Sequence, residues 1–151
     1  MTSTRTSTNS AREAWRYLYE LMLSDASHEH MHAVCESLDL TPGVMKALLT
    51  FDPATPKPMK VLAAQWHCDA SYVTSLVDAL EARGMVERLA HPTDRRAKLI
   101  ALTAEGLRMR QLVMERLHEP PQAMSALTTA EQRTLSGLLR KLVETDGLPT
   151  R

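Results

Sequence analysis

The chain has 151 residues, of which 44% are hydrophobic and 24% are charged, and its 18 basic and 18 acidic side chains cancel to a formal net charge of zero. This length and apolar content suit one domain with a buried core, or one subunit of an intertwined oligomer. No apolar run approaches the roughly 18 residues that a membrane-spanning helix needs, so no segment is expected to span a membrane.

The first nine residues, 1–9, are polar and lack the apolar core of a signal peptide. They are expected to form a disordered tail. Because no export signal is apparent, a cytoplasmic protein is expected, in which the two cysteines, Cys35 and Cys68, stay reduced.

A first helix is expected to begin at Ser10, where Ser10-Ala11-Arg12-Glu13 has the spacing of a capping box. Since it contains no glycine or proline, this helix could continue unbroken to about Leu38. Its early turns, residues 15–23, are apolar on most sides, which predicts burial by more than one partner. A second copy of the chain supplies such partners more readily than a single subunit of this size, which favours a homodimer.

The second half of this expected helix carries three potential metal ligands. His28 and His32 share a face, and Cys35 follows one turn later. Together with His118 from a distant segment they could hold Zn²⁺. The preferred interpretation is exposed or pocket-lining histidines, because such residues are common on helix surfaces rich in charged side chains. No metal and no other cofactor is therefore predicted, and a redox role for Cys35 stays open.

A short helix is expected next, because Thr41-Pro42 combines a capping residue with a proline suited to a first helical turn. The following segment, residues 52–58, contains three prolines and predicts a rigid connector.

Two closely joined helices are predicted after the connector. Residues 59–66 form the first, and after residues 67–69 a second amphipathic helix begins. The apolar stripe of the second helix follows the spacing i, i+3, i+4 and i+7, with Val73, Leu76, Val77 and Leu80. Asp69 can cap its start, and Gly84 follows its end. Helices joined so closely must cross steeply, as in a helix-turn-helix.

A β-hairpin is predicted directly after these helices, with strands at residues 85–89 and 98–102 and a turn at residues 91–96. Between Arg83 and Lys98 there are five basic and two acidic residues. The adjacent Arg95 and Arg96 at the tip suit phosphates or a narrow, negatively charged groove. The alternative is an ordinary solvated turn.

Two helices are expected at the end of the chain. Thr103 can cap the first, which Pro120-Pro121 interrupts or ends. Thr128-x-x-Glu131 is a capping box that opens the second. The second helix carries one apolar stripe, formed by Leu135, Leu138, Leu139 and Leu142.

The central stretch of the chain resembles the MarR family of winged helix-turn-helix transcriptional regulators. The residues that carry the resemblance are Leu62-Ala63, Ser71-x-x-Thr74-x-Leu76-Val77-Asp78-x-Leu80-Glu81-x-x-Gly84-Met85-Val86, Pro92-x-Asp94-Arg95-Arg96-Ala97 and Leu102-Thr103-x-x-Gly106. Asp94-x-Arg96 corresponds to the wing signature of the family. A looser match extends from Ser10 to Glu144.

The resemblance implies a mainly α-helical fold with a small β-hairpin wing and an intertwined helical dimerisation region. It implies an obligate homodimer that binds a palindromic operator in double-stranded DNA and is often released by a small ligand. The terminal stripes fit the interlocking helices of such a dimer, although burial within one subunit is the alternative. The chain would then divide into a tail (1–9), N-terminal helices for dimerisation and a ligand pocket (10–50), a DNA-binding lobe (51–103) and C-terminal dimerisation helices (104–151).

DNA contacts are expected mainly from short side chains. The family often has a basic residue where this chain has Ser75, and Asp78 is acidic, so bidentate contacts to guanine are not expected from the second helix. Readout should depend on hydroxyl groups and on wing arginines that sense groove shape. Asp94 is expected to orient Arg96. The predicted DNA contacts are Ser71, Tyr72, Thr74, Ser75, Arg83, Arg95, Arg96 and Lys98.

The predicted function is that of a transcriptional regulator, most often a repressor, and no enzyme is expected because no catalytic motif is present. A ligand pocket could be lined by Trp15, Tyr19, His32 and Cys35, although the aromatic residues are more often simply core. Two alternatives remain open. The winged helix could serve protein–protein contacts alone, or the regulator could respond to zinc through His28, His32 and Cys35.

Overall fold

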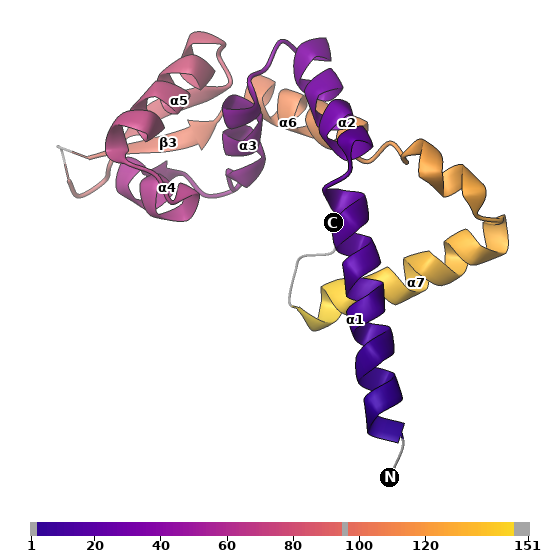
Figure 1. Ribbon diagram of the computed structural model, residues 1–151. Coiled ribbons are helices and arrows are strands. Elements are labelled where there is room, and N and C mark those ends of the chain that lie inside the picture. The colour runs from indigo at the N-terminus through magenta and orange to yellow at the C-terminus, as the bar shows by residue number, and fades with distance from the viewer. Residues whose placement is uncertain (1–2, 95–96, 147–151) are drawn as a thin grey trace. The chain divides into compact units, whose positions relative to one another are not determined.

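The computed structural model describes residues 3–94 and 97–146, and the chain divides into two compact units after His118. The first unit contains six α-helices and a three-stranded sheet, and the second contains a 3-10 helix and one α-helix (Figure 1). The elements of the first unit are α1 (Ser3–Met22), α2 (Asp25–Ser37), α3 (Pro42–Thr50), β1 (Lys57–Pro58), α4 (Met59–Trp66), α5 (Ala70–Ala82), β2 (Val86–Ala90), β3 (Lys98–Leu102) and α6 (Ala104–Leu117). Those of the second are η1 (Gln122–Ala126) and α7 (Thr129–Thr145).

The prediction of one unbroken helix from Ser10 to about Leu38 is wrong. Helix α1 begins at Ser3, within the stretch expected to be a tail, and ends at Met22. The hydroxyl of Ser24 donates to the carbonyl of Leu21 at 2.8 Å and accepts from the backbone N–H of Ser27 at 3.2 Å. This serine therefore ends α1 and caps α2, since a serine side chain can replace helical backbone bonds without help from glycine or proline.

One hydrophobic core holds helices α2 to α6 and the sheet together. Its largest fully buried side chains are Phe51, Leu48, Leu62, Leu80, Met85, Ile100, Val73, Val77 and Val113. The stripe predicted for the second helix of the helix-turn-helix is buried as expected, with Leu76 only 8% exposed. The core takes residues from both sides of the boundaries expected at 50/51 and 103/104, so those boundaries fall within one packed unit.

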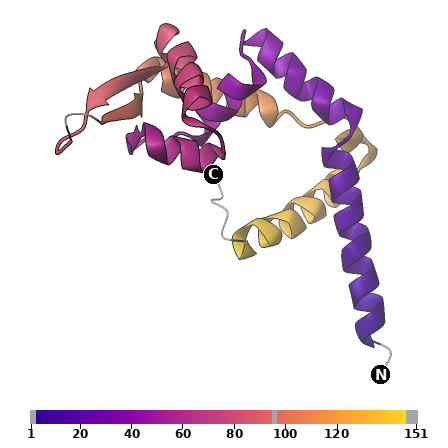
Figure 2. The same cartoon turned by 60° about the vertical axis from the view of Figure 1, so that its left-hand side comes forward.

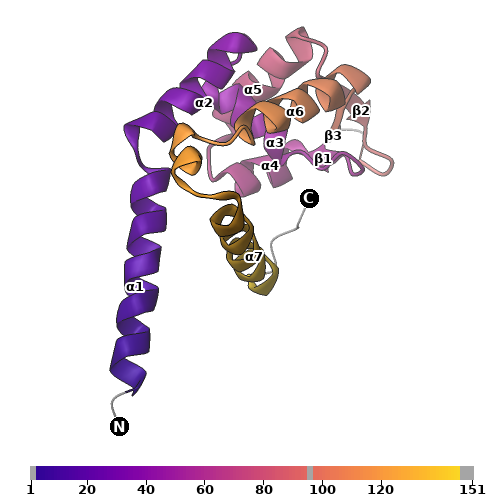
Figure 3. The same ribbon diagram turned by 90° about the vertical axis from the view of Figure 1, so that its right-hand side faces the viewer.

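The sheet has the strand order β1-β3-β2, and the predicted hairpin is confirmed (Figure 3). Val86 lies opposite Leu102 and Ala90 lies opposite Lys98 in the antiparallel pair. Figure 2 shows the hairpin projecting from the helices of the first unit. Strand β1 lies within the segment for which the sequence predicts only a rigid connector. Its two residues pair with Ile100 and Leu99, which is compatible with proline because β1 is an edge strand.

The start of α6 packs directly on the turn between α5 and β2. Thr103 caps α6 by accepting from the N–H of Gly106 at 3.0 Å, and its hydroxyl donates to the carbonyl of Gly84 at 2.5 Å. A Cβ atom added to Gly106 would lie 1.9 Å from the backbone oxygen of Met85. The approach is therefore possible only without a side chain at residue 106.

The second unit has little core of its own. Thr128 and Glu131 form the predicted capping box at the start of α7. No residue of α7 is buried, and Leu138 and Leu142 are 55% and 59% exposed. Helix α1 is similar, because Trp15 is 63% and Met22 is 67% exposed. Both helices thus leave apolar side chains in contact with solvent within the single chain.

None of the helices in the described ranges, 3–94 and 97–146, is both long enough and apolar enough to cross a bilayer.

Candidate nucleic-acid interface

Helix α5 begins with a side-chain cap formed by Asp69. The carboxylate of Asp69 accepts from the hydroxyl of Ser71 at 2.5 Å and from the backbone N–H of Tyr72 at 2.9 Å. These hydrogen bonds hold the pKa of Asp69 below its usual value, the bond from Ser71 having the largest effect. The cap therefore stays charged at neutral pH and fixes where α5 starts, only residues 67–69 after α4.

The outward face of α5 carries short hydroxyl side chains. Ser71, Thr74 and Ser75 are all exposed. The hydroxyl of Thr74 donates to the carbonyl of Ala70 at 2.8 Å, and that of Ser75 donates to the carbonyl of Ser71 at 3.1 Å. Each hydroxyl keeps free acceptor capacity and can rotate to donate elsewhere. The face can thus make short, neutral hydrogen bonds, and no basic residue lies between Ala70 and Ala82.

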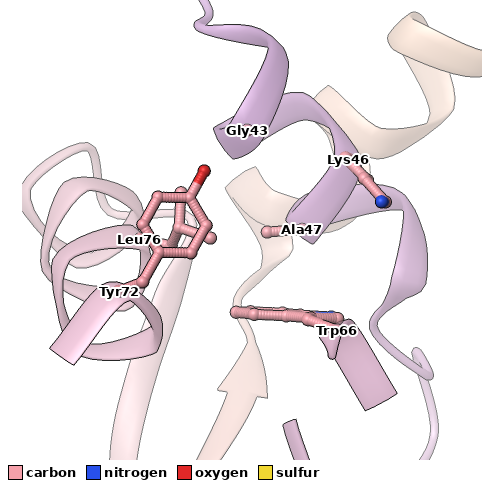
Figure 4. Close-up of a pocket in the computed structure, with 6 residues that line it drawn as sticks. All are labelled: Gly43, Lys46, Ala47, Trp66, Tyr72 and Leu76. Carbon is pink, nitrogen blue, oxygen red and sulfur yellow. The ribbon is translucent and has the colours of Figure 1, made fainter. Parts of the chain in front are cut away.

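Tyr72, predicted as a DNA contact, lies over α3. Its hydroxyl points toward Gly43, where an added Cβ would be only 2.6 Å away (Figure 4). Tyr72 and Gly43 line a cavity of about 100 Å³ together with Lys46, Ala47, Trp66 and Leu76. The indole N–H of Trp66 donates to the hydroxyl of Thr50 at 2.6 Å, which fixes one wall. The cavity lies between α3, α4 and α5, and the sequence interpretation missed it because the lining residues come from three elements.

The turn of the hairpin is organised by His91, which the sequence interpretation did not single out. Its Nδ1 atom accepts from the backbone N–H groups of Thr93 at 3.3 Å and Asp94 at 3.2 Å. The predicted contacts Arg95 and Arg96, and with them the expected pairing of Asp94 with Arg96, lie outside the described residues. Lys98 is exposed at the start of β3.

Arg83, also predicted as a DNA contact, binds the end of another helix. Its guanidinium donates to the carbonyl of Leu38 at 3.1 Å and to the carbonyl of Asp39. These carbonyls follow the C-terminus of α2, where a cation is favoured because the last carbonyl groups are unpaired. Arg83 therefore attaches the end of α5 to α2.

Arg88 of β2 forms the principal ion pairs of α5, and sequence reasoning did not identify this role. Its guanidinium donates to Asp78 at 2.5 Å and also to Glu81. The hydrogen bond to Asp78 is the main reason why the pKa of Arg88 is raised above its usual value. The sequence gives no direct signal for this contact, because it joins a helix to a strand.

The predicted ligand-pocket residues are not brought together. Trp15 and Tyr19 are exposed on α1, and His32 is exposed on α2. Cys35 is buried instead, with its thiol 3.6 Å from the sulfur of Met45. Burial raises the pKa of the Cys35 thiol, which disfavours the reactive thiolate that a redox sensor needs.

The candidate zinc cluster is also not assembled. Nδ1 of His28 lies 3.0 Å from the carbonyl oxygen of Ser24, and Cys35 points into the core. His118 is an exposed residue at the end of α6. Within the part of the chain that the structure describes, no three His, Cys, Asp or Glu residues are placed to hold a metal ion. The spacing of the histidines is correct for one helix face, but Cys35 has a different orientation.

Comparison of the sequence with known proteins identifies relatives of this chain. The MarR family model matches residues 40–98, which include α3 to the start of the second strand of the hairpin. The multiple antibiotic resistance protein MarR of Escherichia coli is 30% identical over 129 residues, which are 81% of this chain and 86% of that protein. A transcriptional regulatory protein named for the hcr operon of Thauera aromatica is 31% identical over 108 residues, but the match spans only 65% of its length.

Solved structures of other proteins have a fold similar to that of this chain. The transcriptional regulator Tm0710 of Thermotoga maritima has a TM-score of 0.72 and 26% identity, over 89% of this chain and 96% of that one. A mutant of the S. aureus protein MepR, bound to an oligodeoxyribonucleotide, has a TM-score of 0.65 and 20% identity, over 87% and 96% of the two chains. The second likeness supports the fold alone. With the sequence match to MarR over most of both chains, these findings establish that the chain belongs to the MarR family of winged helix-turn-helix transcriptional regulators.

Proposed function

We propose that the protein represses transcription by binding a palindromic operator in double-stranded DNA as a homodimer. Helix α5 enters the major groove, and the tip of the β2–β3 hairpin reaches the flanking minor groove. The observation that carries this proposal is the exposed hydroxyl stripe of α5, formed by Ser71, Thr74 and Ser75, next to a hairpin that begins its second strand with Lys98. The MepR mutant that is bound to an oligodeoxyribonucleotide has the same fold, so this fold is compatible with DNA binding.

The dimer is supported by the apolar surface of α1 and α7. Exposed tryptophan, methionine and leucine side chains on two long helices are unfavourable in water, and a second copy of the chain can bury them. Two recognition helices related by a two-fold axis would then read half-sites about 34 Å apart. A palindromic operator follows directly from this symmetry.

Sequence discrimination is expected to depend on short contacts and on DNA shape. The hydroxyl groups of α5 can contact either donors or acceptors on base edges, and the methyl group of Thr74 can contact thymine. Guanine readout by a long bidentate side chain is not available from this helix. The wing arginines would supply the remaining selectivity through the width of the minor groove.

Replacing Arg96 by alanine is expected to lower operator affinity by more than about tenfold, because one minor-groove or phosphate contact per subunit is lost. The melting temperature should stay within a few degrees of the wild-type value, since residue 96 falls in the sequence between the two strands of the hairpin. Fluorescence anisotropy with a labelled operator duplex measures the affinity. Arg133→Ala, on the exposed surface of α7, is the charge-matched control. Wild-type affinity in the Arg96 variant would contradict the role given to the wing.

The same proposal includes release by a small ligand, for which the cavity beside Tyr72 is the best-placed site. It has aromatic walls from Trp66 and Tyr72 and a cation, Lys46, at its edge. At about 100 Å³ it is smaller than most ligand sites, so an effector would be small or would widen it. A ligand that widens the cavity would displace Tyr72 and therefore α5. The ligand and the DNA would then each bind best to a different position of α5.

Gly43→Ala tests this coupling. The new methyl group would displace the flexible end of Tyr72 rather than backbone, so stability should change by less than about 1 kcal/mol. The variant should lose the response to any compound that releases the wild-type protein from its operator. A compound screen read out by anisotropy supplies the probe, and a variant that is still released by the same compound would place the effector elsewhere. Gly137→Ala, in an open position of α7, is the matched control.

A further inference from the structure

The face of α5 that is proposed to enter DNA carries an acidic residue. Asp78 lies seven residues after Ser71 and four after Thr74, so it continues the same helical stripe. Its side chain is 58% exposed. Glu81 follows one turn later and is 39% exposed. Two uncompensated carboxylates here would repel the phosphate groups that flank a major groove.

Arg88 pairs with both carboxylates from outside the helix and offsets part of their charge. It lies on β2 two residues after the buried Val86, so its side chain leaves the same face of the strand, toward α5. The guanidinium binds Asp78 at 2.5 Å and Glu81 at the same time, and the arginine side chain is only 29% exposed. A partly shielded cation with two partners is screened by salt less than an ordinary surface pair.

We propose that Arg88 is a positioning residue for DNA binding, which offsets part of the negative charge of Asp78 and Glu81 so that α5 can approach the phosphate backbone. This inference rests on the proposed function, because it requires α5 to enter the major groove. Arg88 acts through the two carboxylates and does not contact DNA itself. Arg88 lies at the middle of β2 and reduces the negative charge on a helix that has no basic residue of its own.

Two simpler roles would give different results. If Arg88 only braced the hairpin against α5, loss of either side of the ion pair would weaken binding. If Arg88 contacted a phosphate directly, loss of the carboxylates would not restore binding to a variant without the arginine. Under the proposal, the carboxylates weaken binding much more when Arg88 is absent than when it is present.

The experiment measures operator affinity over a series of salt concentrations for four full-length proteins. These are the wild type, Arg88→Met, Asp78→Asn/Glu81→Gln and the combined triple variant. Arg88→Met should bind at least about tenfold more weakly, with a shallower dependence of log affinity on log salt concentration. The triple variant should return to within about threefold of the wild type, and Asp78→Asn/Glu81→Gln should bind at least as tightly as the wild type with a steeper salt dependence.

Wild-type affinity in Arg88→Met, or a triple variant as weak as Arg88→Met, would overturn the proposal. If Arg88→Met fails to fold by circular dichroism, Asp78→Asn/Glu81→Gln decides alone, because weaker binding than wild type would then mean that the ion pairs only brace the hairpin. If the wild type selects no DNA site at all, the proposed function fails first, and that outcome is separate from a wild type that binds while the variants disagree with the inference.

Discussion

Replacing Leu138 by glutamate is expected to convert the proposed dimer into a monomer and to weaken operator binding by at least about a hundredfold. Leu138 is 55% exposed within the single chain and belongs to a stripe of leucines on a helix without buried residues. A carboxylate at the centre of an apolar interface would be desolvated without a partner, which costs several kcal/mol. A monomer would also lose the advantage of binding two half-sites at once.

Sedimentation equilibrium measures the mass of the variant, and fluorescence anisotropy measures its affinity for the operator. Ser136→Glu is the control, because this exposed residue of α7 lies outside the leucine stripe and receives the same charge. A Leu138→Glu protein that keeps both the dimer mass and the wild-type affinity would contradict the assignment of α7 to the dimer interface.

Gly106→Ala should strongly destabilise the first unit. The new Cβ atom would lie 1.9 Å from the backbone oxygen of Met85 and 3.0 Å from a side-chain atom of Leu102. Backbone cannot move aside cheaply, so α6 must separate from the turn that leads into the hairpin. The free energy of unfolding is expected to fall by about 3 kcal/mol, at the upper end of the usual effect of overpacking.

Urea denaturation followed by circular dichroism measures this change. Gly137→Ala is a stringent comparison, because residue 137 lies within α7 with no heavy atom near the position of the added Cβ. That substitution should leave stability unchanged or raise it by up to about 1 kcal/mol, through helix propensity. Equal stability of the two variants would show that the close approach of α6 to Met85 does not exist in solution.

Local patterns predict the helix-turn-helix well. The stripe of Val73, Leu76, Val77 and Leu80 is buried, and Asp69 caps α5 as expected. Thr41, Thr103 and Thr128 cap the helices that follow them. These features depend on neighbours within one or two helical turns, so spacing in the sequence is sufficient to find them.

Features that depend on distant partners are missed by the same patterns. The contacts of the Arg83 guanidinium with the carbonyls of Leu38 and Asp39, 45 and 44 residues away in the chain, are not predicted from the sequence. Arg88 is not singled out, because its carboxylate partners come from another element. The burial of Cys35 depends on how α2 packs against α3, and periodicity alone does not determine that packing.

Short elements are missed for a different reason. Strand β1 has only two residues and is paired through its backbone, so no alternation of side chains could mark it. The end of α1 depends on one serine, Ser24, whose hydroxyl binds locally. Serine is common within helices as well as at their ends, so its presence alone does not predict a break.

The most direct test of the central claim is selection of genomic DNA fragments by the purified full-length protein, followed by footprinting of the selected site at two salt concentrations. The account predicts one protected, two-fold-symmetric site with half-site centres about 34 Å apart, and binding that weakens as salt increases. Weak, sequence-independent binding with no symmetric footprint would contradict it, and would mean that the winged helix of this chain serves a contact other than the reading of DNA.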